Sequence, residues 1–367
     1  MPRDIYLRPV GLVPSSPLLG AGQTHGLLRL AGGWLDFMGL EVLERHGPEG
    51  VARILGIGDF CERDWGGQTL PAARLFEALH EPRPRLAGLA LDRPRIMGIV
   101  NITPDSFSDG GPYQDARAAI DHARRLEEAG ADILDLGAES TRPGSDPVSV
   151  DEELRRLMPV LEALAGVTQA LISVDTRKAE VMRRAAAAGA DLINDVSALS
   201  HDPAAIEAAG ESRLPVVLMH ALGDPKTMQD DPRYDNVLFD VFDYLESRIG
   251  DCEAAGISRS RLLVDPGIGF GKTLEHNLAL MARLAMLHGL GVPVVLGASR
   301  KRFIGTLTGV SEARARGPGS VGAALSAVGQ GVQIVRVHDV AETRQALTVW
   351  EAALAGRASP PEPAARA

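Results

Sequence analysis

The chain is poor in cysteine and has no long apolar segment. Its 367 residues include only two cysteines, Cys61 and Cys252, so neither a disulfide framework nor a cysteine-based zinc site is expected. No run of about eighteen apolar residues occurs, and the opening MPRDIYLRPVGLVPSS lacks the charged and apolar regions of a signal sequence. The formal net charge of -10 disfavours nucleic acid or an anionic membrane surface as a partner. We therefore expect a cytoplasmic protein.

The chain instead contains eight short apolar runs that each lead into polar residues. Helix-like segments of roughly a dozen residues or more separate the runs, and this alternation predicts an α/β fold, the (β/α)8 TIM barrel. Because the carboxyl ends of barrel strands carry the chemistry, the polar residues should line one pocket. The runs and the polar residues after them are 96–100 (Asn101), 133–134 (Asp135), 171–174 (Asp175), 192–193 (Asn194), 216–219 (His220), 262–264 (Asp265), 294–296 (Ser299 and Lys301) and 334–335 (Arg336 and His338).

Residues 1–90 do not belong to this repeating pattern. Apolar segments around Gly32 and Gly33 predict a β-hairpin over 27–42, and residues 70–79 predict a short helix. Residues 81–94 contain three prolines and three arginines, as is typical of a linker. We expect a small N-terminal α/β appendage of unknown role over 1–90, a barrel over 94–355 and a disordered tail over 356–367.

Apolar residues at helical spacing predict the helices of the barrel. The first covers 115–129, and Ser149 with Glu152 predicts a capping box before the second, in which Pro159 predicts a kink. The other helices are expected at about 178–189, 203–210, 235–255, 274–290, 318–330 and 341–355.

Two loops rich in turn-forming residues follow the first two runs. NITPDSFSDGG at 101–111 is long for a strand-to-helix connection and carries the apolar Phe107, which favours a mobile binding loop over a plain surface turn. In GAESTRPG at 137–144, the pair Thr141–Arg142 precedes Pro143. An arginine there suits a loop that closes over phosphate or carboxylate, and the alternative is an ordinary rim loop.

Asp175, Asn194 and Asp265 end three different runs. A single such residue is more often a helix cap than a ligand-binding group, and Asp175 with Thr176 could cap the helix that follows. Three converging side chains rich in acceptors are explained better by a flat heterocycle with several N–H donors.

The segments that follow the last three runs carry glycines or basic residues that suit ligand binding. DPGIGFGKT at 265–273 is no phosphate loop, because Pro266 occupies the place of the first glycine. Its glycines suit close approach of the backbone to a ligand, and Phe270 suits an aromatic wall or the core. Basic residues at 299–302 and 336–338 follow the last two runs, where many barrels bind phosphate. The histidines lack metal-binding spacing, although a magnesium held through a diphosphate and one oxygen ligand stays open.

Eight ordered motifs resemble those of the dihydropteroate synthase family. They are IMGIVNITPDSFSDGG, ILDLGAESTRPG, ISVDTRK, LINDVSA, PVVLMH, LLVDPGIGFGK, LGASRKRFIG and VRVHD, and they span about residues 94–355. The resemblance implies a TIM-barrel transferase that joins (7,8-dihydropterin-6-yl)methyl diphosphate to 4-aminobenzoate. The products would be pyrophosphate and 7,8-dihydropteroate, for folate biosynthesis. The resemblance also implies Mg2+ as cofactor and a homodimer.

The resemblance assigns roles to residues by matching position. The catalytic residues would be Asp105, Arg142 and Lys301, with Asp105 stabilising a pterin cation, and Asn101 would contact the magnesium. Arg336 and His338 would bind the diphosphate, while Phe107, Thr141 and Pro143 would form the 4-aminobenzoate pocket. The residues around the pterin ring would be Asp135, Asp175, Asn194, Met219, Asp265, Gly269, Phe270 and Lys301.

Three features depart from the family pattern. Residues 1–90 have no counterpart in its compact members, Ile268 replaces a frequent aromatic, and Arg302 stands where a small hydroxyl residue is common. Arg302 therefore leaves open how the carboxylate of 4-aminobenzoate is bound. Two other functions compete: a pterin-dependent methyltransferase, which would need no TPDSF or STRPG loop, and a paralogue that binds pterin without turnover. The intact Asn101, Asp105, Arg142 and Lys301 argue against the second.

Overall fold

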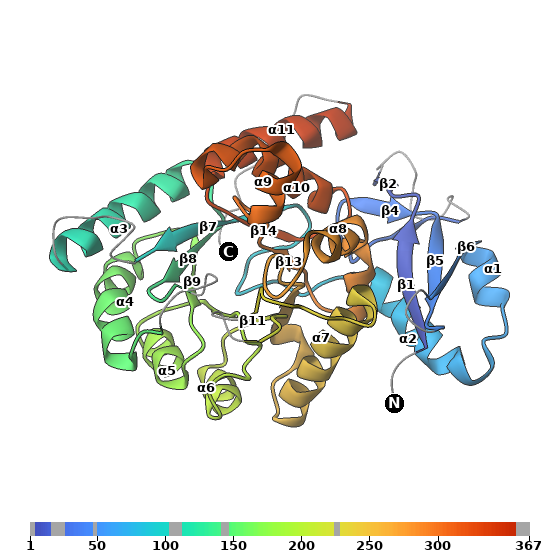
Figure 1. Ribbon diagram of the computed structural model, residues 1–367, viewed down its shortest axis with the longest axis horizontal. Coiled ribbons are helices and arrows are strands. Elements are labelled where there is room, and N and C mark those ends of the chain that lie inside the picture. The colour runs from blue at the N-terminus through green and yellow to red at the C-terminus, as the bar shows by residue number, and fades with distance from the viewer. Residues whose placement is uncertain are drawn as a thin grey trace.

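The computed structural model describes residues 4–15, 26–46, 50–102, 112–140, 147–223 and 228–356. Eight parallel strands in these ranges form one sheet that curls into a barrel (Figure 1). Their order in the sheet is β12-β11-β10-β9-β8-β7-β14-β13, and a parallel bridge between Val264 and Val294 joins the two ends. The predicted TIM barrel is thus confirmed. The strands are β7 (Arg95–Asn101), β8 (Ile133–Gly137), β9 (Leu171–Asp175), β10 (Leu192–Asp195), β11 (Val216–Met219), β12 (Leu262–Asp265), β13 (Val295–Leu296) and β14 (Ile334–Val337).

One apolar side chain from each strand fills the interior of the barrel. These side chains form a buried cluster, which Leu86 and Leu91 of the preceding segment join: Met97, Ile133, Leu171, Leu192, Val217, Leu263, Val295 and Ile334. Because side chains alternate between the two faces of a strand, the residues two positions further along also face the interior. We call these residues the second layer: Ile99, Asp135, Ser173, Asn194, Met219, Asp265, Gly297 and Arg336. The period of the strand alone thus places polar groups directly beyond an apolar floor.

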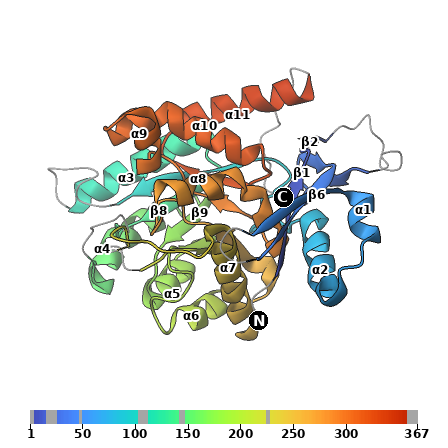
Figure 2. The ribbon, with the colours of Figure 1, turned by 45° about the vertical axis from the view of Figure 1, so that its right-hand side comes forward.

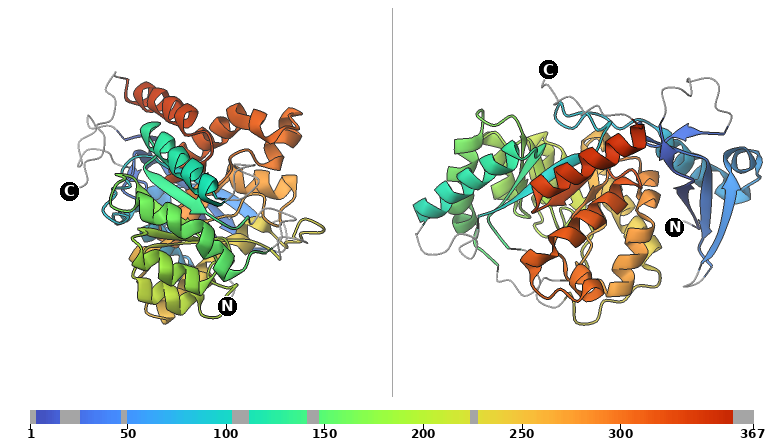
Figure 3. Two further views of the ribbon diagram at one scale, coloured as in Figure 1. Left: turned by 90° about the vertical axis from the view of Figure 1, so that its left-hand side faces the viewer. Right: turned by 90° about the horizontal axis from the view of Figure 1, so that it is seen from above.

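Helices surround the barrel, and most of those predicted are confirmed (Figures 1 and 3). The prediction of one helix over 274–290 is wrong, because α8 ends at Ala282 and a 3-10 helix follows. The helices are α3 (Pro112–Glu128), α4 (Val150–Leu164), α5 (Ala179–Ala187), α6 (Ala205–Ser212), α7 (Val237–Ala254), α8 (Leu274–Ala282), α9 (Arg302–Thr308), α10 (Gly317–Val328) and α11 (Val340–Ala355), with 3-10 helices η3 (Arg259–Arg261), η4 (Leu284–Leu290) and η5 (Ala313–Arg316). No helix within the described ranges is long and apolar enough to cross a membrane.

The start of α4 shows half of the predicted capping box. Ser149 Oγ accepts a hydrogen bond from Glu152 N at 3.2 Å, as such a box requires. The Glu152 carboxylate instead accepts bonds from Arg155 and Arg156, because charge-assisted bonds to guanidinium groups are the stronger choice. The helix continues through Pro159.

An appendage formed by residues 5–80 lies beside the barrel (Figure 1). The predicted hairpin is confirmed only where β3 pairs with β4, since the chain from Gly39 onward belongs to a second sheet. The predicted helix at 70–79 is confirmed as α2. The sheets have the orders β1-β5-β6 and β2-β4-β3. The elements are β1 (Ile5–Val10), β2 (Val13–Pro14), β3 (Leu28–Arg29), β4 (Leu35–Phe37), β5 (Gly39–Glu44), β6 (Val51–Gly56), α1 (Ile57–Glu62), η1 (Gly66–Gln68) and α2 (Thr69–His80).

The appendage packs against α7 and η4 of the barrel (Figure 2). The ring of Tyr6 stacks on Phe239 with centroids 4.3 Å apart, and its hydroxyl donates to Asp243 at 2.9 Å. Arg45 Nη2 lies 2.6 Å from the same carboxylate, and Arg83 Nη2 donates to the His288 carbonyl at 2.8 Å. Apolar stacking and half-buried polar bonds thus join the two parts.

Candidate active site

Arg336 connects three strands at the carboxyl end of the barrel. Its Nε donates to Asp135 Oδ2 at 2.6 Å, and its Nη2 donates to Asp175 Oδ2 at 2.8 Å. Asp135 also accepts bonds from Ser173 Oγ at 2.6 Å and Asn194 Nδ2 at 3.1 Å. Four of these five residues belong to the second layer, and Asp175 follows Ser173 by two positions on the same face of β9. The alternation of the strands therefore builds this network.

The network carries more carboxyl groups than cations. Burial raises the pKa of Asp175 to about 7 against the opposing effect of Arg336, and Asp135 raises it further. Burial also raises the pKa of Asp265. Burial alone would lower the pKa of Arg336, but the carboxylates of Asp135 and Asp175 raise it above its ordinary value. Asp135, Asp175 and Asp265 face two cations, Arg336 and Lys301, so the site suits a ligand that brings N–H donors.

Asp265 and Lys301 approach each other around Gly297. Asp265 accepts bonds from the backbone N–H groups of Gly297 at 3.2 Å and of Gly267 at 2.7 Å. A Cβ atom at Gly297 would lie 3.5 Å from Asp265 Oδ2 and 3.8 Å from Lys301 Nζ, so a side chain there would fill the space between the two charged groups. Burial lowers the pKa of Lys301 to about 8, although Asp265 opposes this effect. The glycine keeps this gap open for the edge of a ligand.

The loop after β12, residues 266–272, presents Phe270. Lys301 Nζ donates to the Ile268 carbonyl and stands 4.6 Å from the centroid of the Phe270 ring. Gly267, Gly269 and Gly271 all have positive φ. A Cβ atom at Gly267 would lie 1.8 Å from the His220 carbonyl oxygen, which no side chain tolerates. At Gly267 the glycine lets the loop after β12 approach the loop after β11, and the approach of these glycines to a ligand stays a prediction.

The loops after β13 and β14 meet at Ser299 and His338. Ser299 Oγ accepts the backbone N–H of His338 at 3.2 Å and lies 3.0 Å from its Nδ1. A serine proton directed at Nδ1 leaves the ring proton on Nε2, which can then donate to an anion. Arg300 is paired with Asp339, whereas Arg302 is exposed. The basic run at 299–302 is thus no single cluster.

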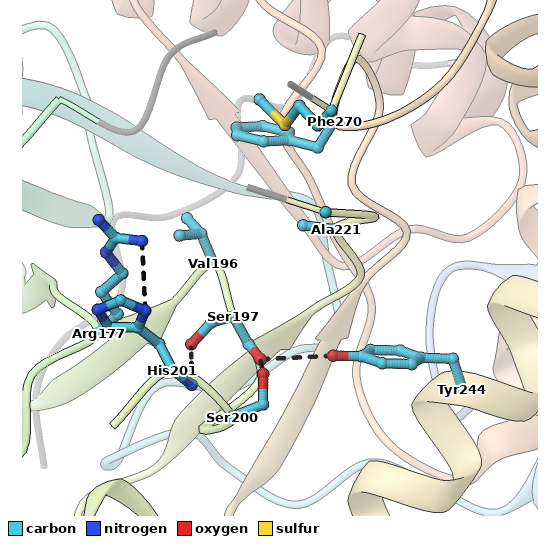
Figure 4. Close-up of a pocket in the computed structure, with 10 residues that line it drawn as sticks. Arg177, Val196, Ser197, Ser200, His201, Ala221, Tyr244 and Phe270 are labelled. Atoms are coloured by element: carbon cyan, nitrogen blue, oxygen red, sulfur yellow. Dashed lines mark hydrogen bonds between the residues drawn. The ribbon is translucent and has the colours of Figure 1, made fainter. Parts of the chain in front are cut away.

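A cavity of about 410 Å³ continues the site outward (Figure 4). Arg177, Val196 and Ala221 follow the predicted residues Asp175, Asn194 and Met219 by two positions each, so the cavity begins where these strands end. Phe270 and Tyr244 supply aromatic walls, and Phe270 also belongs to the site described above. The cavity is lined by Arg177, Val196, Ser197, Ser200, His201, Ala221, Gly223, Met228, Tyr244 and Phe270.

The structure brings many of the predicted site residues together, and others lie outside the described ranges. Asp175 does not cap α5, because Ala179 N donates instead to Asp202 Oδ2 at 2.9 Å, whereas Thr176 Oγ1 accepts the N–H of the N-cap residue Lys178 at 3.3 Å. Met219 is buried and lies in the second layer beside the loop after β12. The predicted residues outside the described ranges are Asp105, Phe107, Thr141, Arg142 and Pro143. Those brought together are Asp135, Asp175, Asn194, Asp265, Gly269, Phe270, Lys301 and Arg336.

Two residues of the site were missed from the sequence. Ser173 bonds to Asp135, and Gly297 both donates to Asp265 and leaves space beside Lys301. A signal existed for Ser173, because it is a polar residue within an apolar run and precedes Asp175 by two positions. Gly297 gave no comparable signal in the sequence.

The residues present fit only a loosely held magnesium. Within the described ranges, no group of three or more His, Cys, Asp or Glu side chains could hold a metal ion. Asn101 ends β7 with a half-buried amide, which offers one hard oxygen ligand. Such a ligand suits Mg2+ that keeps several waters and is bound mainly by substrate phosphates.

Comparisons with known proteins identify the family. The model of the pterin binding enzyme family matches residues 97–338. The chain is 51% identical over 269 residues to dihydropteroate synthase of Escherichia coli K12, which covers 73% of this chain and 95% of the relative. A solved dihydropteroate synthase of Xanthomonas albilineans with 4-aminobenzoic acid is 54% identical, with a TM-score of 0.71, and the match covers 74% of this chain and 99% of that one.

A longer relative bears on the appendage. The mitochondrial folate synthesis bifunctional protein of Pisum sativum is 41% identical over 387 residues, covering 97% of this chain and 68% of the relative. That match must include most of residues 1–90, which the shorter relatives lack. The family follows from the matches to the barrel, which include the family model over residues 97–338. The chain therefore belongs to the pterin binding enzymes, among the dihydropteroate synthases.

Proposed function

We propose that this C–N bond-forming transferase joins (7,8-dihydropterin-6-yl)methyl diphosphate to 4-aminobenzoate in folate biosynthesis. The products are 7,8-dihydropteroate and pyrophosphate. The observation that carries the proposal is the buried charged network at the carboxyl end of the barrel, in which Arg336 joins Asp135 and Asp175 while Asp265 faces Lys301. Its surplus of acceptors suits the N–H groups along the edge of a pterin.

We assign the pterin ring to the space around Gly297. The carboxylate of Asp265 accepts hydrogen bonds from the aminopyrimidine edge, and the Lys301 ammonium donates to the ring carbonyl or a ring nitrogen. Asn194 offers both a donor and an acceptor, and Asp175 offers a further acceptor. Met219, Gly269 and Phe270 contact the faces of the ring, where an aromatic side chain contributes stacking. Asp135 supports the network through Arg336 and Asn194.

The diphosphate is assigned to the side of His338. Its Nε2 donates to a phosphate oxygen when Nδ1 is bonded to Ser299. Arg336 uses two of its five N–H groups on Asp135 and Asp175, so its others serve the diphosphate. Asn101 would hold Mg2+, which when bound offsets negative charge on the diphosphate.

The reaction breaks the exocyclic C–O bond, and its electron pair leaves with the diphosphate. The neutral aniline nitrogen then forms the new bond to the methylene carbon and loses a proton. Asp105 is assigned to stabilise the pterin cation, and Arg142 to act with Lys301 in catalysis. Phe107, Thr141 and Pro143 surround 4-aminobenzoate. Exclusion of water matters here, because water would otherwise capture the cation.

The barrel at 94–355 carries the activity and residues 1–90 form an appendage, while all but the first residue of the tail predicted at 356–367 lies outside the described residues. The protein works in the cytoplasm as a homodimer, with small molecules as substrates and with neither nucleic acid nor a membrane as partner. The net charge of -10 supports this last point.

The substitution Asp265→Asn tests where the pterin lies. It keeps the size of the side chain and removes the charge, so we expect the Kd for the pterin diphosphate, measured by calorimetry, to rise at least about tenfold. Asp243→Asn, at the contact with the appendage, is the matched control and should leave this Kd unchanged. An unchanged Kd in D265N would place the pterin elsewhere.

A further inference from the structure

Lys272 is a buried lysine to which the proposed reaction gives no role. Its side chain is 3% exposed, and its Nζ lies 2.8 Å from His220 Nδ1 and 3.0 Å from the Phe270 carbonyl oxygen. The His220 carbonyl oxygen, at 3.5 Å, is a third acceptor. In the motif FGKT this lysine looks like a phosphate-binding residue, but here it points into the protein and joins two loops.

The groups around Lys272 explain its hydrogen bonds. Burial lowers the pKa of His220 to about 2, so the ring stays neutral and its Nδ1 can accept a bond from the amine. Burial also lowers the pKa of Lys272 well below its ordinary value, and the nearby Lys301 lowers it further. An amine in such a place needs acceptors, because an unpaired buried donor is costly. The two loops provide them.

The bonds of Lys272 reach both aromatic walls of the cavity. Phe270 is held directly through its carbonyl group. Tyr244 is reached through His220, whose ring meets the tyrosine edge to face with centroids 4.8 Å apart and planes at 80°. Figure 4 shows Phe270 and Tyr244 lining separate parts of the cavity. One buried amine thus links the two rings that bound this space.

The loops that Lys272 joins are also packed tightly. A Cβ atom at Gly271 would lie 2.7 Å from Leu222 Cβ, and the Gly271 carbonyl accepts a bond from the Tyr234 hydroxyl at 2.7 Å. Gln229 Nε2 donates to the Gly269 carbonyl at 2.6 Å. Backbone contact thus sets how close the loops come, while Lys272 supplies the polar link nearest to Phe270.

We propose that Lys272 is a positioning residue that holds Phe270 in place, links it through His220 to Tyr244, and thereby sets the affinity of the site for a flat heterocycle. The inference rests on the proposed function, in which that heterocycle is the pterin. Without the amine, the Phe270 carbonyl loses its donor and the His220 ring is released to turn. Phe270 and Tyr244 then lose the polar link that joins them. His338, which is assigned to bind the diphosphate, keeps its contacts.

The test compares Lys272→Met with the wild-type full-length chain. Methionine keeps the length and apolar stem of the side chain but removes the donor. The Kd values for 6-hydroxymethylpterin and for inorganic pyrophosphate are measured separately by calorimetry, and turnover of the wild type is measured first. We expect the pterin Kd to rise at least tenfold and the pyrophosphate Kd to stay within twofold. Tyr6→Phe, which removes a buried hydroxyl at the appendage, is the control and should change neither.

Each result decides the inference. A pterin Kd within twofold of wild type, or equal losses for both probes, overturns it. Where K272M yields no folded protein, His220→Leu removes one acceptor and the contact with Tyr244, and the same separation of the two Kd values is expected. A wild-type chain that binds pterin and makes no product would instead refute the proposed function, and the positioning role would still be measured by the two Kd values.

Discussion

Arg336 Nη2 lies 2.8 Å from Asp175 Oδ2, although their strands, β14 and β9, are separated in the sheet by β7 and β8. The pair therefore crosses the mouth of the barrel instead of joining two neighbouring strands. Asp135, on β8, accepts the Nε of the same guanidinium. This arrangement makes Arg336 the centre of the site and ties the stability of the barrel to it.

Replacing Arg336 by methionine should weaken both folding and binding. The change leaves two buried carboxylates without their cation, so we expect the free energy of unfolding to fall by about 3–5 kcal/mol. Urea unfolding measures this loss, and calorimetry measures the Kd for the pterin diphosphate. Arg344→Met is a matched control, because Arg344 bonds Asp132 at the opposite end of the barrel with the same 21–22% exposure of its side chain. It should cost stability and leave the Kd unchanged, and an unchanged Kd in R336M would contradict the assigned site.

Replacing Lys301 by alanine should weaken pterin binding strongly. A lost charge-assisted hydrogen bond is worth about 1.5–3 kcal/mol, which corresponds to a rise in Kd of roughly 10- to 150-fold. The neighbouring Arg302 is exposed, and Arg302→Ala should leave the pterin Kd unchanged. Its effect on the KM for 4-aminobenzoate shows whether Arg302 contacts the carboxylate. A pterin Kd that does not change in K301A would refute the role of Lys301.

Replacing Asp105 by alanine should nearly abolish turnover and leave binding of the pterin diphosphate within a few fold. The physical reason is that its carboxylate is assigned to a charge that develops only as the C–O bond breaks, so it stabilises the transition state more than the bound substrate. Steady-state turnover and calorimetry on the same preparation separate the two effects. If D105A lost binding of the pterin diphosphate but kept turnover, this assignment would be wrong.

Acid should destabilise the protein through His288, whose buried ring bonds to the Gln330 carbonyl. Burial lowers the pKa of this histidine to about 3, so it stays neutral while the unfolded chain takes up a proton near pH 6.5. Its contribution to stability is therefore complete above pH 6.5 and is lost as the pH falls towards 3, by about 1.4 kcal/mol per pH unit. His288→Gln should reduce the slope of the free energy of unfolding against pH by about 1.4 kcal/mol per pH unit, the value for one proton. Equal slopes in H288Q and wild type would contradict this cause.

The strand ends could be predicted from the sequence because each polar residue directly follows an apolar run. Asp135, Asn194 and Asp265 are examples, and the period of two also predicts that Ser173 faces the same way as Asp175. The bridge from Arg336 to Asp175 could not be predicted, because it depends on the width and stagger of the closed barrel. The stacking of Tyr6 on Phe239 joins parts of the chain far apart in sequence, and no local pattern marks it. The break between α8 and η4 lies at Arg283, where neither glycine nor proline marks the end of a helix.

The most direct measurement is pyrophosphate release from (7,8-dihydropterin-6-yl)methyl diphosphate in the presence of magnesium, with and without 4-aminobenzoate. We predict release that requires 4-aminobenzoate and yields 7,8-dihydropteroate in equal amount. Tight binding of the pterin diphosphate with neither release nor product would contradict the synthase function and leave a pterin-binding protein without turnover.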